Sequence, residues 1–118
     1  MRRAAFLLLL ALTGCPGFGN EDPVVPAQVT YNDNIKAILD AHCIKCHVVP
    51  PKNGAPTGFR LDQYADDNAG NQGAMNKAPL IKSNTDIDFM PLAPNPHLTQ
   101  LEKDTIARWI DQGTRESL

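Results

Sequence analysis

A short segment, residues 43–47 with the sequence Cys-Ile-Lys-Cys-His, has the residue types and spacing that most clearly predict chemistry. Cys43 and Cys46 lie three positions apart, so each thiol can form a thioether to one vinyl group of the same porphyrin. His47 follows directly and can bind the porphyrin iron. The segment therefore predicts one covalently attached haem c, with His47 as the proximal iron ligand.

A Cys-x-x-Cys pair has three other uses, and each fits this sequence less well. A zinc site needs further ligands, whereas the one remaining cysteine is Cys15. A thioredoxin-like redox pair calls for a surrounding βαβ pattern, and no alternating strand pattern flanks these residues. A disulfide between Cys43 and Cys46 would close a very small loop and would stabilise the fold little. Haem attachment is the interpretation that we favour.

The first residues are typical of an export signal. Arg2 and Arg3 precede an apolar run, residues 4–12, that is too short to span a bilayer and suits a signal peptide. The run ends in Leu-Thr-Gly-Cys at residues 12–15, which resembles the lipobox of bacterial lipoproteins. We therefore predict a lipoprotein signal peptide at residues 1–14, with Cys15 as the lipidated first residue of the mature chain. An ordinary secretory signal with an incidental cysteine is the alternative.

The same features set the expected location. Haem c is attached after an unfolded chain has been translocated, which favours the general secretory route over twin-arginine export. Several acyl chains would anchor the protein stably, whereas a single chain gives marginal binding. Pro16 stands where lipoproteins retained in the inner membrane commonly carry aspartate. We therefore expect a lipid-anchored protein that faces the periplasm, on the outer membrane in preference to the inner one.

The composition suits one small domain built around a cofactor. The chain has 118 residues, of which 10 are proline, 8 are glycine and 6% are aromatic, so a large apolar core would be hard to assemble unaided. The formal net charge is −2, and no basic patch indicates a nucleic-acid partner. We expect a flexible tether at residues 15–29, whose residues 16–29 could reach roughly 45 Å, and one monomeric domain at residues 30–118.

Helices are predicted at both ends of this domain. Thr30 can cap the first helix together with Asp33, and this helix leads into Cys43. A Thr-x-x-Glu capping box at residues 99–102 opens the last helix, which should end near residue 113. Between them we expect a loop at 48–58, a short helix at 61–68 and a loop at 70–76. The expected buried faces are Tyr31, Ile35, Ile38 and Leu39 in the first helix, and Leu101, Ile106, Trp109 and Ile110 in the last.

Met90 is the candidate for the sixth iron ligand. It stands in the sequence Phe-Met-Pro, and Pro91 biases Met90 away from the helical conformation, which lowers the entropic cost of holding the sulfur in place. Met75 is an alternative without rigid support, and His97 would give a bis-histidine iron of lower potential. His42 is adjacent to Cys43 and cannot reach the far face of a haem. We therefore predict axial ligation by His47 and Met90.

Three motifs together resemble the small monohaem cytochromes c of the His/Met type. They are Ile-Leu-x-x-x-Cys-x-x-Cys-His at 38–47, Met-Pro at 90–91 and Trp-Ile-x-x-Gly at 109–113, so the resemblance covers about residues 30–114. It implies an all-α, cytochrome c-like fold in which the terminal helices cross beside the haem, with long loops rich in proline and glycine. Tyr31 or Ile35 would then meet Ile106 or Trp109.

The resemblance also implies details of the site. In this family the proximal histidine donates its second ring proton to a backbone carbonyl in the following loop, so His47 should find such a partner within residues 50–56. The position after Met90 and Pro91 is Leu92, where these cytochromes often carry a second proline. This departure affects the expected path of the loop and leaves the proposed ligand unchanged.

The resemblance implies electron transfer. An iron whose two axial positions are filled by His47 and Met90 offers no open site for a substrate. We expect a membrane-anchored periplasmic electron carrier, not an enzyme, that cycles one haem between Fe(II) and Fe(III) and has redox proteins as partners. If Met90 is labile, a peroxidase-like enzyme or a gas sensor is the alternative, with Asp86, Asp88 and His97 as its polar groups. A chain without haem would be a lipoprotein with an interaction role.

Overall fold

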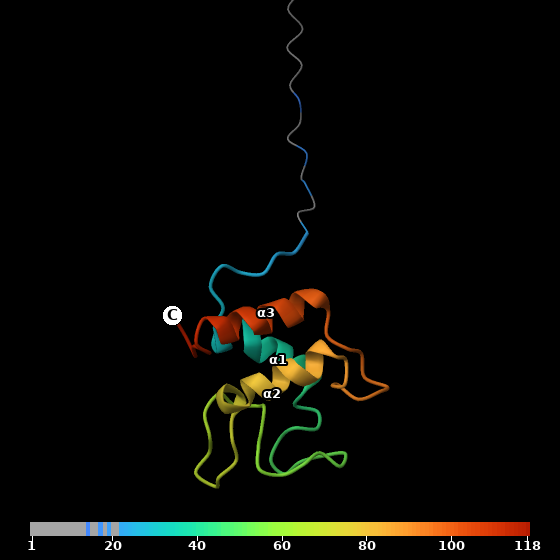
Figure 1. Ribbon diagram of the computed structural model, residues 1–118, viewed down its shortest axis with the longest axis vertical. Helices are drawn as coiled ribbons and strands as arrows, with labels where there is room; N and C mark the ends of the chain where they lie inside the picture. Colours follow the sequence, from blue (N-terminus) through green and yellow to red (C-terminus); the bar gives the residue numbers. More distant parts are fainter. Residues whose placement is uncertain (1–13, 15–16, 18, 20–21) are drawn as a thin grey trace, which may run out of the picture.

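The structure, a computed structural model, describes residues 14, 17, 19 and 22–118 (Figure 1). The predicted signal peptide and Cys15 lie outside these residues. Within the described part the fold is all-α, as predicted, with no strand and one isolated bridge between Phe59 and Gln72. None of its helices is long and apolar enough to cross a membrane. The elements are the π-helical turn η1 (Tyr31–Ile35) and the helices α1 (Lys36–His42), α2 (Ala74–Asp86) and α3 (Gln100–Asp111).

The first helical segment begins where the sequence predicts it. The Thr30 hydroxyl accepts a hydrogen bond from the Asp33 N–H at 3.1 Å, which satisfies one of the free donors at the helix start. Helix α1 continues η1 and ends at His42, so residues 43–47 leave directly from its carboxyl end. All four apolar residues of the predicted face are buried: Tyr31, Ile35, Ile38 and Leu39.

The last helix forms where it is predicted, but of its four expected buried residues Leu101 and Ile110 are only half-buried. Thr99 and Glu102 form the capping box, with hydrogen bonds in both directions. Ile106 and Trp109 are completely buried, and the Trp109 Nε1–H donates to the Arg115 carbonyl at 2.9 Å. Gly113 has a φ of 87°, the left-handed conformation that commonly ends a helix. Helix α3 therefore presents one apolar face to the interior.

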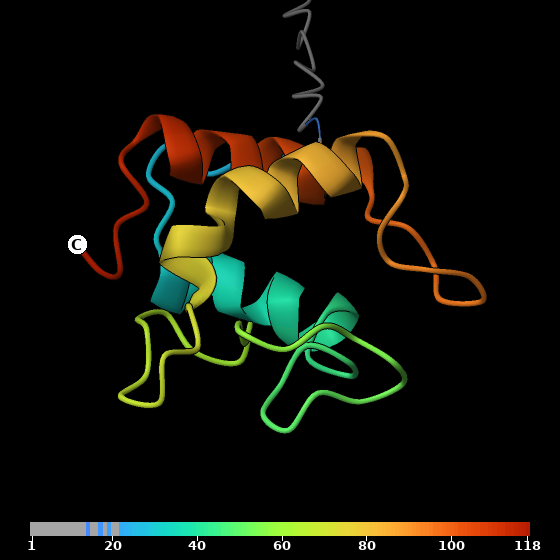
Figure 2. The same ribbon diagram turned by 60° about the horizontal axis from the view of Figure 1, so that its bottom comes forward.

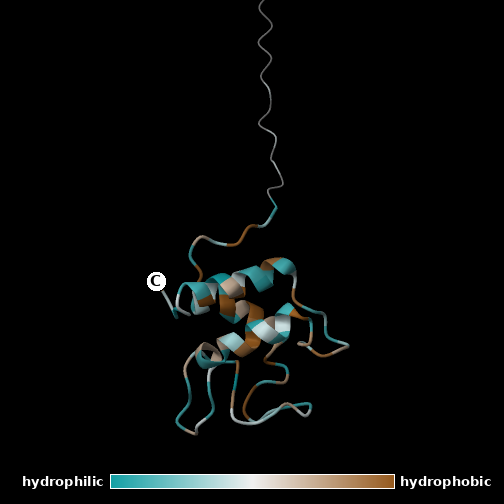
Figure 3. Cartoon of the chain, in the orientation of Figure 1, coloured by the Kyte–Doolittle hydropathy of each residue, from teal (hydrophilic) through white to brown (hydrophobic). Residues whose placement is uncertain are grey.

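The two terminal helical segments pack together. The rings of Tyr31 and Trp109 have centroids 6.4 Å apart, which confirms the predicted contact between η1 and α3. The Tyr31 N–H also donates to the Arg115 carbonyl at 2.9 Å. Helix α2 packs against α3, and η1 also contacts α3 (Figures 1 and 2). Hydrophobic segments are concentrated where these helices face one another, while much of the surrounding loop is hydrophilic (Figure 3).

Helix α2 corrects the prediction for the middle of the chain. Residues 61–68 form turns instead of the expected short helix, and the expected loop at 70–76 gives way to α2 at Ala74. The turns supply partners for the free donors of α2, because the Ala74 and Met75 N–H groups each donate at 3.0 Å to the carbonyls of Gln63 and Tyr64. The preceding residue must be glycine, since a Cβ at Gly73 would collide with backbone carbonyl oxygens of this segment.

Part of the predicted tether packs on the domain. Val29 is buried, and its N–H donates to Gln112 Oε1 at 2.9 Å. Gln112 Nε2 donates to the Ala27 carbonyl at 2.8 Å, and Arg108 Nη1 donates to the Pro26 carbonyl at 3.0 Å. The packed part of the chain therefore begins before residue 30, on the outer side of α3.

Candidate functional site

Two adjoining pockets lie between the segment that follows α1 and the carboxyl end of α2. Their volumes are about 150 and 160 Å³, both are partly open to solvent, and together we call them the shared cavity. The second pocket is lined mainly by apolar side chains, including Leu61, Leu80 and Ile81. An apolar hollow with a few polar groups is the usual form of a cofactor site. The residues that line both pockets are Cys43, His47, Pro56, Thr85 and Met90.

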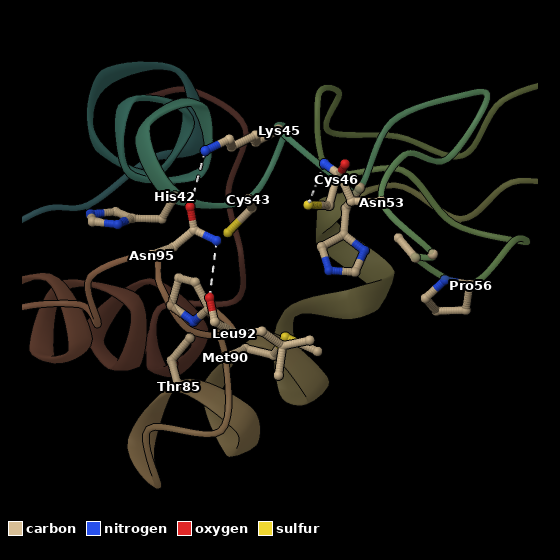
Figure 4. Close-up of a pocket in the computed structure, with 14 residues that line it drawn as sticks. His42, Cys43, Lys45, Cys46, Asn53, Pro56, Thr85, Met90, Leu92 and Asn95 are labelled. Atoms are coloured by element: carbon tan, nitrogen blue, oxygen red, sulfur yellow. Dashed lines mark hydrogen bonds between the residues drawn. The ribbon is translucent and has the colours of Figure 1, made fainter.

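Residues 43–47 form a turn that directly follows α1 and lines the shared cavity. The Cys43 N–H donates to the Leu39 carbonyl at 2.8 Å, and the His47 N–H donates to the Cys43 carbonyl at 3.0 Å. Cys43 and Cys46 are both free thiols and both line the first pocket (Figure 4). Burial raises the pKa of Cys43 to about 12, so its thiol is protonated at neutral pH. Two reduced sulfurs therefore stand at one edge of the cavity.

His47 forms part of the cavity wall beside Phe59. The two rings are stacked, with centroids 5.0 Å apart and planes inclined by 26°. Burial lowers the pKa of His47, which favours the neutral imidazole, the form that binds metals. Its Nδ1 is buried and has no hydrogen-bond partner among the described residues. The carbonyl partner expected for this ring within residues 50–56 is therefore not found, and that prediction is wrong for this structure.

Met90 reaches the shared cavity from the end of α2. It is half-buried and lines both pockets, as His47 does. The N–H groups of Phe89 and Met90 donate to the same acceptor, the Asn84 carbonyl, at 3.0 and 3.1 Å. Because Asn84 belongs to the last turn of α2, this unpredicted helix is the element that positions Met90.

The alternative ligands lie elsewhere. Met75 is in the first turn of α2 and His97 is exposed, 3.7 Å from Asp88; neither lines the shared cavity. Asp86 and Asp88 are also exposed and do not line it. His42 lines the first pocket, but its Nε2 lies 2.9 Å from Glu102 Oε1. The four predicted haem-site residues that the structure brings to one pocket are Cys43, Cys46, His47 and Met90.

The donor set of the shared cavity fits a haem c. Its two thiols are free, and an imidazole and a thioether line the same space. Among the described residues there is no group of three or more His, Cys, Asp or Glu side chains that could hold a metal ion. A haem iron does not need such a group, because the porphyrin supplies four ligands and the protein only the axial ones.

Several residues that line the cavity belong to no sequence motif and were not predicted as part of the site. Lys45 Nζ donates to Asn95 Oδ1 at 3.2 Å, and Asn95 Nδ2 donates to the Leu92 carbonyl at 3.0 Å (Figure 4). This chain of bonds links residues 43–47 to the segment after Met90. Asn53 similarly donates from Nδ2 to Cys46 Sγ at 3.4 Å. Of these contacts, only the bond between Lys45 and Asn95 joins segments far apart in the sequence, and no sequence pattern predicts it.

The chain matches no protein-family model, no curated protein and no solved structure. The site is therefore interpreted from its own residues.

Proposed function

We propose that this protein is an electron carrier with a cytochrome c-like fold, which holds one haem c through thioethers at Cys43 and Cys46. His47 and Met90 are the proposed axial ligands. One observation carries the proposal: a neutral imidazole and a thioether, 43 positions apart in sequence, line the same apolar cavity beside two free thiols.

The haem would supply one-electron chemistry when bound. The chain's own residues would do the rest. Burial keeps the His47 imidazole neutral, so no proton competes for its ligand nitrogen. Leu61, Leu80 and Ile81 give the site an apolar wall, with Leu80 47% exposed, and a thioether ligand in apolar surroundings favours a high reduction potential. With both axial positions filled, the protein would hold no substrate of its own, which supports electron carriage over catalysis.

The proposal includes an anchored location. Lipidation at Cys15 would hold the domain on the periplasmic side of a membrane, with the outer membrane favoured by Pro16. A monomer that meets other redox proteins is the proposed working form. Support comes from the signal-like start of the chain, whose residues 12–15 resemble a lipobox.

A pyridine haemochrome assay on the purified full-length protein tests this function. We expect a spectrum typical of two saturated vinyl groups, and haem that stays with the polypeptide after extraction with acidified organic solvent. Cys43→Ala and Cys46→Ala should each leave one thioether and should accumulate poorly. Haem that is released from the wild-type protein, or no haem at all, would contradict the proposal. Rapid binding of carbon monoxide and turnover of peroxide by wild-type protein would favour the enzyme or sensor alternative.

A further inference from the structure

The segment that carries Met90 is tied to α3 by one ion pair. Lys103 Nζ donates to Asp88 Oδ1 at 2.7 Å, and Asp88 lies two residues before Met90. The Lys103 side chain is 13% exposed and that of Asp88 is 47% exposed, whereas Lys36 and Asp40, the ion pair on α1, are 48% and 39% exposed. Only the lysine of the Asp88 pair is shielded, and a shielded charge is screened less by water and salt, so this bond should constrain its loop more than the pair on α1 does.

Asp88 occupies an unusual backbone conformation at this point. Its φ is 57°, in the left-handed region that residues other than glycine seldom adopt, although aspartate tolerates it better than most. Its N–H donates to the Thr85 carbonyl at 3.1 Å, which closes the turn at the end of α2. The direction in which the chain leaves α2 toward Met90 therefore depends on what holds Asp88 in place. Its carboxylate accepts the hydrogen bond from Lys103 at 2.7 Å, whereas the exposed His97 Nδ1 lies farther away, at 3.7 Å.

The residue before Lys103 contacts the opposite wall of the shared cavity. Glu102 Oε1 lies 2.9 Å from His42 Nε2, and His42 immediately precedes Cys43. Two consecutive residues in the first turn of α3 therefore contact the two sides of the site. Glu102 contacts His42, next to the thiol of Cys43, and Lys103 contacts Asp88, near the thioether of Met90. One helical turn thus contacts, through two side chains, a residue that lines the cavity and a residue of the segment that leads to Met90.

We propose that Lys103 is a positioning residue for Met90, which holds the thioether against the shared cavity through its bond to Asp88. The proposal rests on the proposed function, in which Met90 is the sixth iron ligand. Loss of this bond should increase the fraction of molecules in which the Met90 segment has moved away. A ligand that competes with Met90 then binds with higher apparent affinity, because its binding-competent form is more populated.

The test is a titration of the ferric, haem-loaded protein with imidazole, followed by the near-infrared band that a thioether on Fe(III) produces. We expect Lys103→Met to bind imidazole about fivefold more tightly than wild type, the upper range for a partly exposed ion pair. Lys103→Arg keeps the charge and the donor, and should remain within about twofold of wild type. Lys36→Met removes a charge from an exposed pair on α1, and its imidazole affinity should also stay within about twofold of wild type.

The outcomes separate this proposal from the function on which it rests. A wild-type protein with the band and a Lys103→Met variant with unchanged imidazole affinity would overturn the role of Lys103 alone. A wild-type protein without the band would overturn ligation by Met90, and the role of Lys103 with it. If far-ultraviolet circular dichroism shows that Lys103→Met does not fold, Asp88→Asn replaces it, since asparagine tolerates the same φ. Tighter binding by Asp88→Asn supports the proposal, and unchanged binding overturns it.

Discussion

The imidazole ring of His47 stacks on the phenyl ring of Phe59, with centroids 5.0 Å apart. Lys77 Nζ lies 5.1 Å from the centroid of the same phenyl ring. Phe59 is therefore in contact with the proposed proximal ligand and, through its π-system, with a cation. No motif in the sequence marks it as part of the site.

Replacement of Phe59 by leucine should destabilise the protein and loosen the His47 ring. We expect Phe59→Leu to lower the free energy of unfolding by about 1 kcal/mol, because the side chain is half-buried and leucine cannot stack. Phe89→Leu is the matched control, since Phe89 is 56% exposed and should tolerate the change. Urea unfolding at pH 7 measures both variants, and equal midpoints would show that the stacking contributes nothing.

Three substitutions decide between the candidate sixth ligands. Met90→Ala should abolish the near-infrared band of the ferric protein and lower the reduction potential, because the thioether favours Fe(II). Met75→Ala and His97→Ala should leave both nearly unchanged, since neither side chain lines the shared cavity. Absorption spectra and redox titration of the three purified variants provide the comparison.

The same variants report on an open coordination position. Met90→Ala should bind carbon monoxide or cyanide rapidly and should gain a low peroxidase activity. Stopped-flow mixing measures the binding rates against wild type. A band that persists in Met90→Ala and disappears in Met75→Ala or His97→Ala would refute the assignment of Met90.

The carboxylate of Glu102 should make stability depend on pH. Burial alone would raise the pKa of Glu102. Hydrogen bonds from Thr99 and the contact with His42 lower the pKa by more than burial raises it, so the net pKa is below the usual glutamate value. A carboxyl whose folded pKa is depressed stabilises the protein above its unfolded pKa of about 4.3, and this contribution is lost as the pH falls through the folded pKa. The contribution of the Glu102 carboxylate to the stability of the fold should therefore be complete at pH 6 and absent in strong acid.

Glu102→Gln isolates this charge, because glutamine can still complete a capping box. The variant should be less stable than wild type above about pH 5, and the difference should shrink as the pH falls. Glu116→Gln, at an exposed position, serves as the control. Urea unfolding at a series of pH values measures the difference, and a gap that does not change with pH would contradict the role of the charge.

The lipid anchor is tested at Cys15. The mature amino terminus should be a diacylated or triacylated cysteine, and Cys15→Ala should block both lipidation and cleavage at this position. Mass spectrometry of the intact protein from membranes detects the modification. An unmodified mature terminus at another residue would rule out the anchor, and fractionation of inner and outer membranes tests the expected location.

Local patterns predicted the two ends of the fold well. The caps at Thr30 and Thr99 depend on hydrogen bonds between residues three positions apart, and the apolar face of each terminal helix follows from helical periodicity. The contact between Tyr31 and Trp109 was expected from the resemblance to the cytochromes c, because periodicity gives faces and not partners. The spacing of Cys43 and His47 is likewise local. These features depend on neighbours in sequence, which is why the sequence alone was sufficient.

Helix α2 could not be recognised in the same way. Its buried positions recur at helical intervals, but two are alanines, and the helix contains Pro79. Proline removes a backbone donor, and small side chains give a faint periodic signal. Its free N–H groups are satisfied by residues of the preceding turns, a tertiary contact that no periodic pattern encodes. The support of Met90 by Asn84 was missed with it.

The attachment of residues 25–29 to the domain shortens the segment available between an anchor at Cys15 and the domain. Only residues 16–24 would remain to span that gap, roughly 30 Å when fully extended. A lipidated molecule would then diffuse in two dimensions, within a thin layer above its own membrane. For a partner anchored in the same membrane, a short tether raises the effective concentration of the carrier. Encounter would depend on lateral movement along the bilayer.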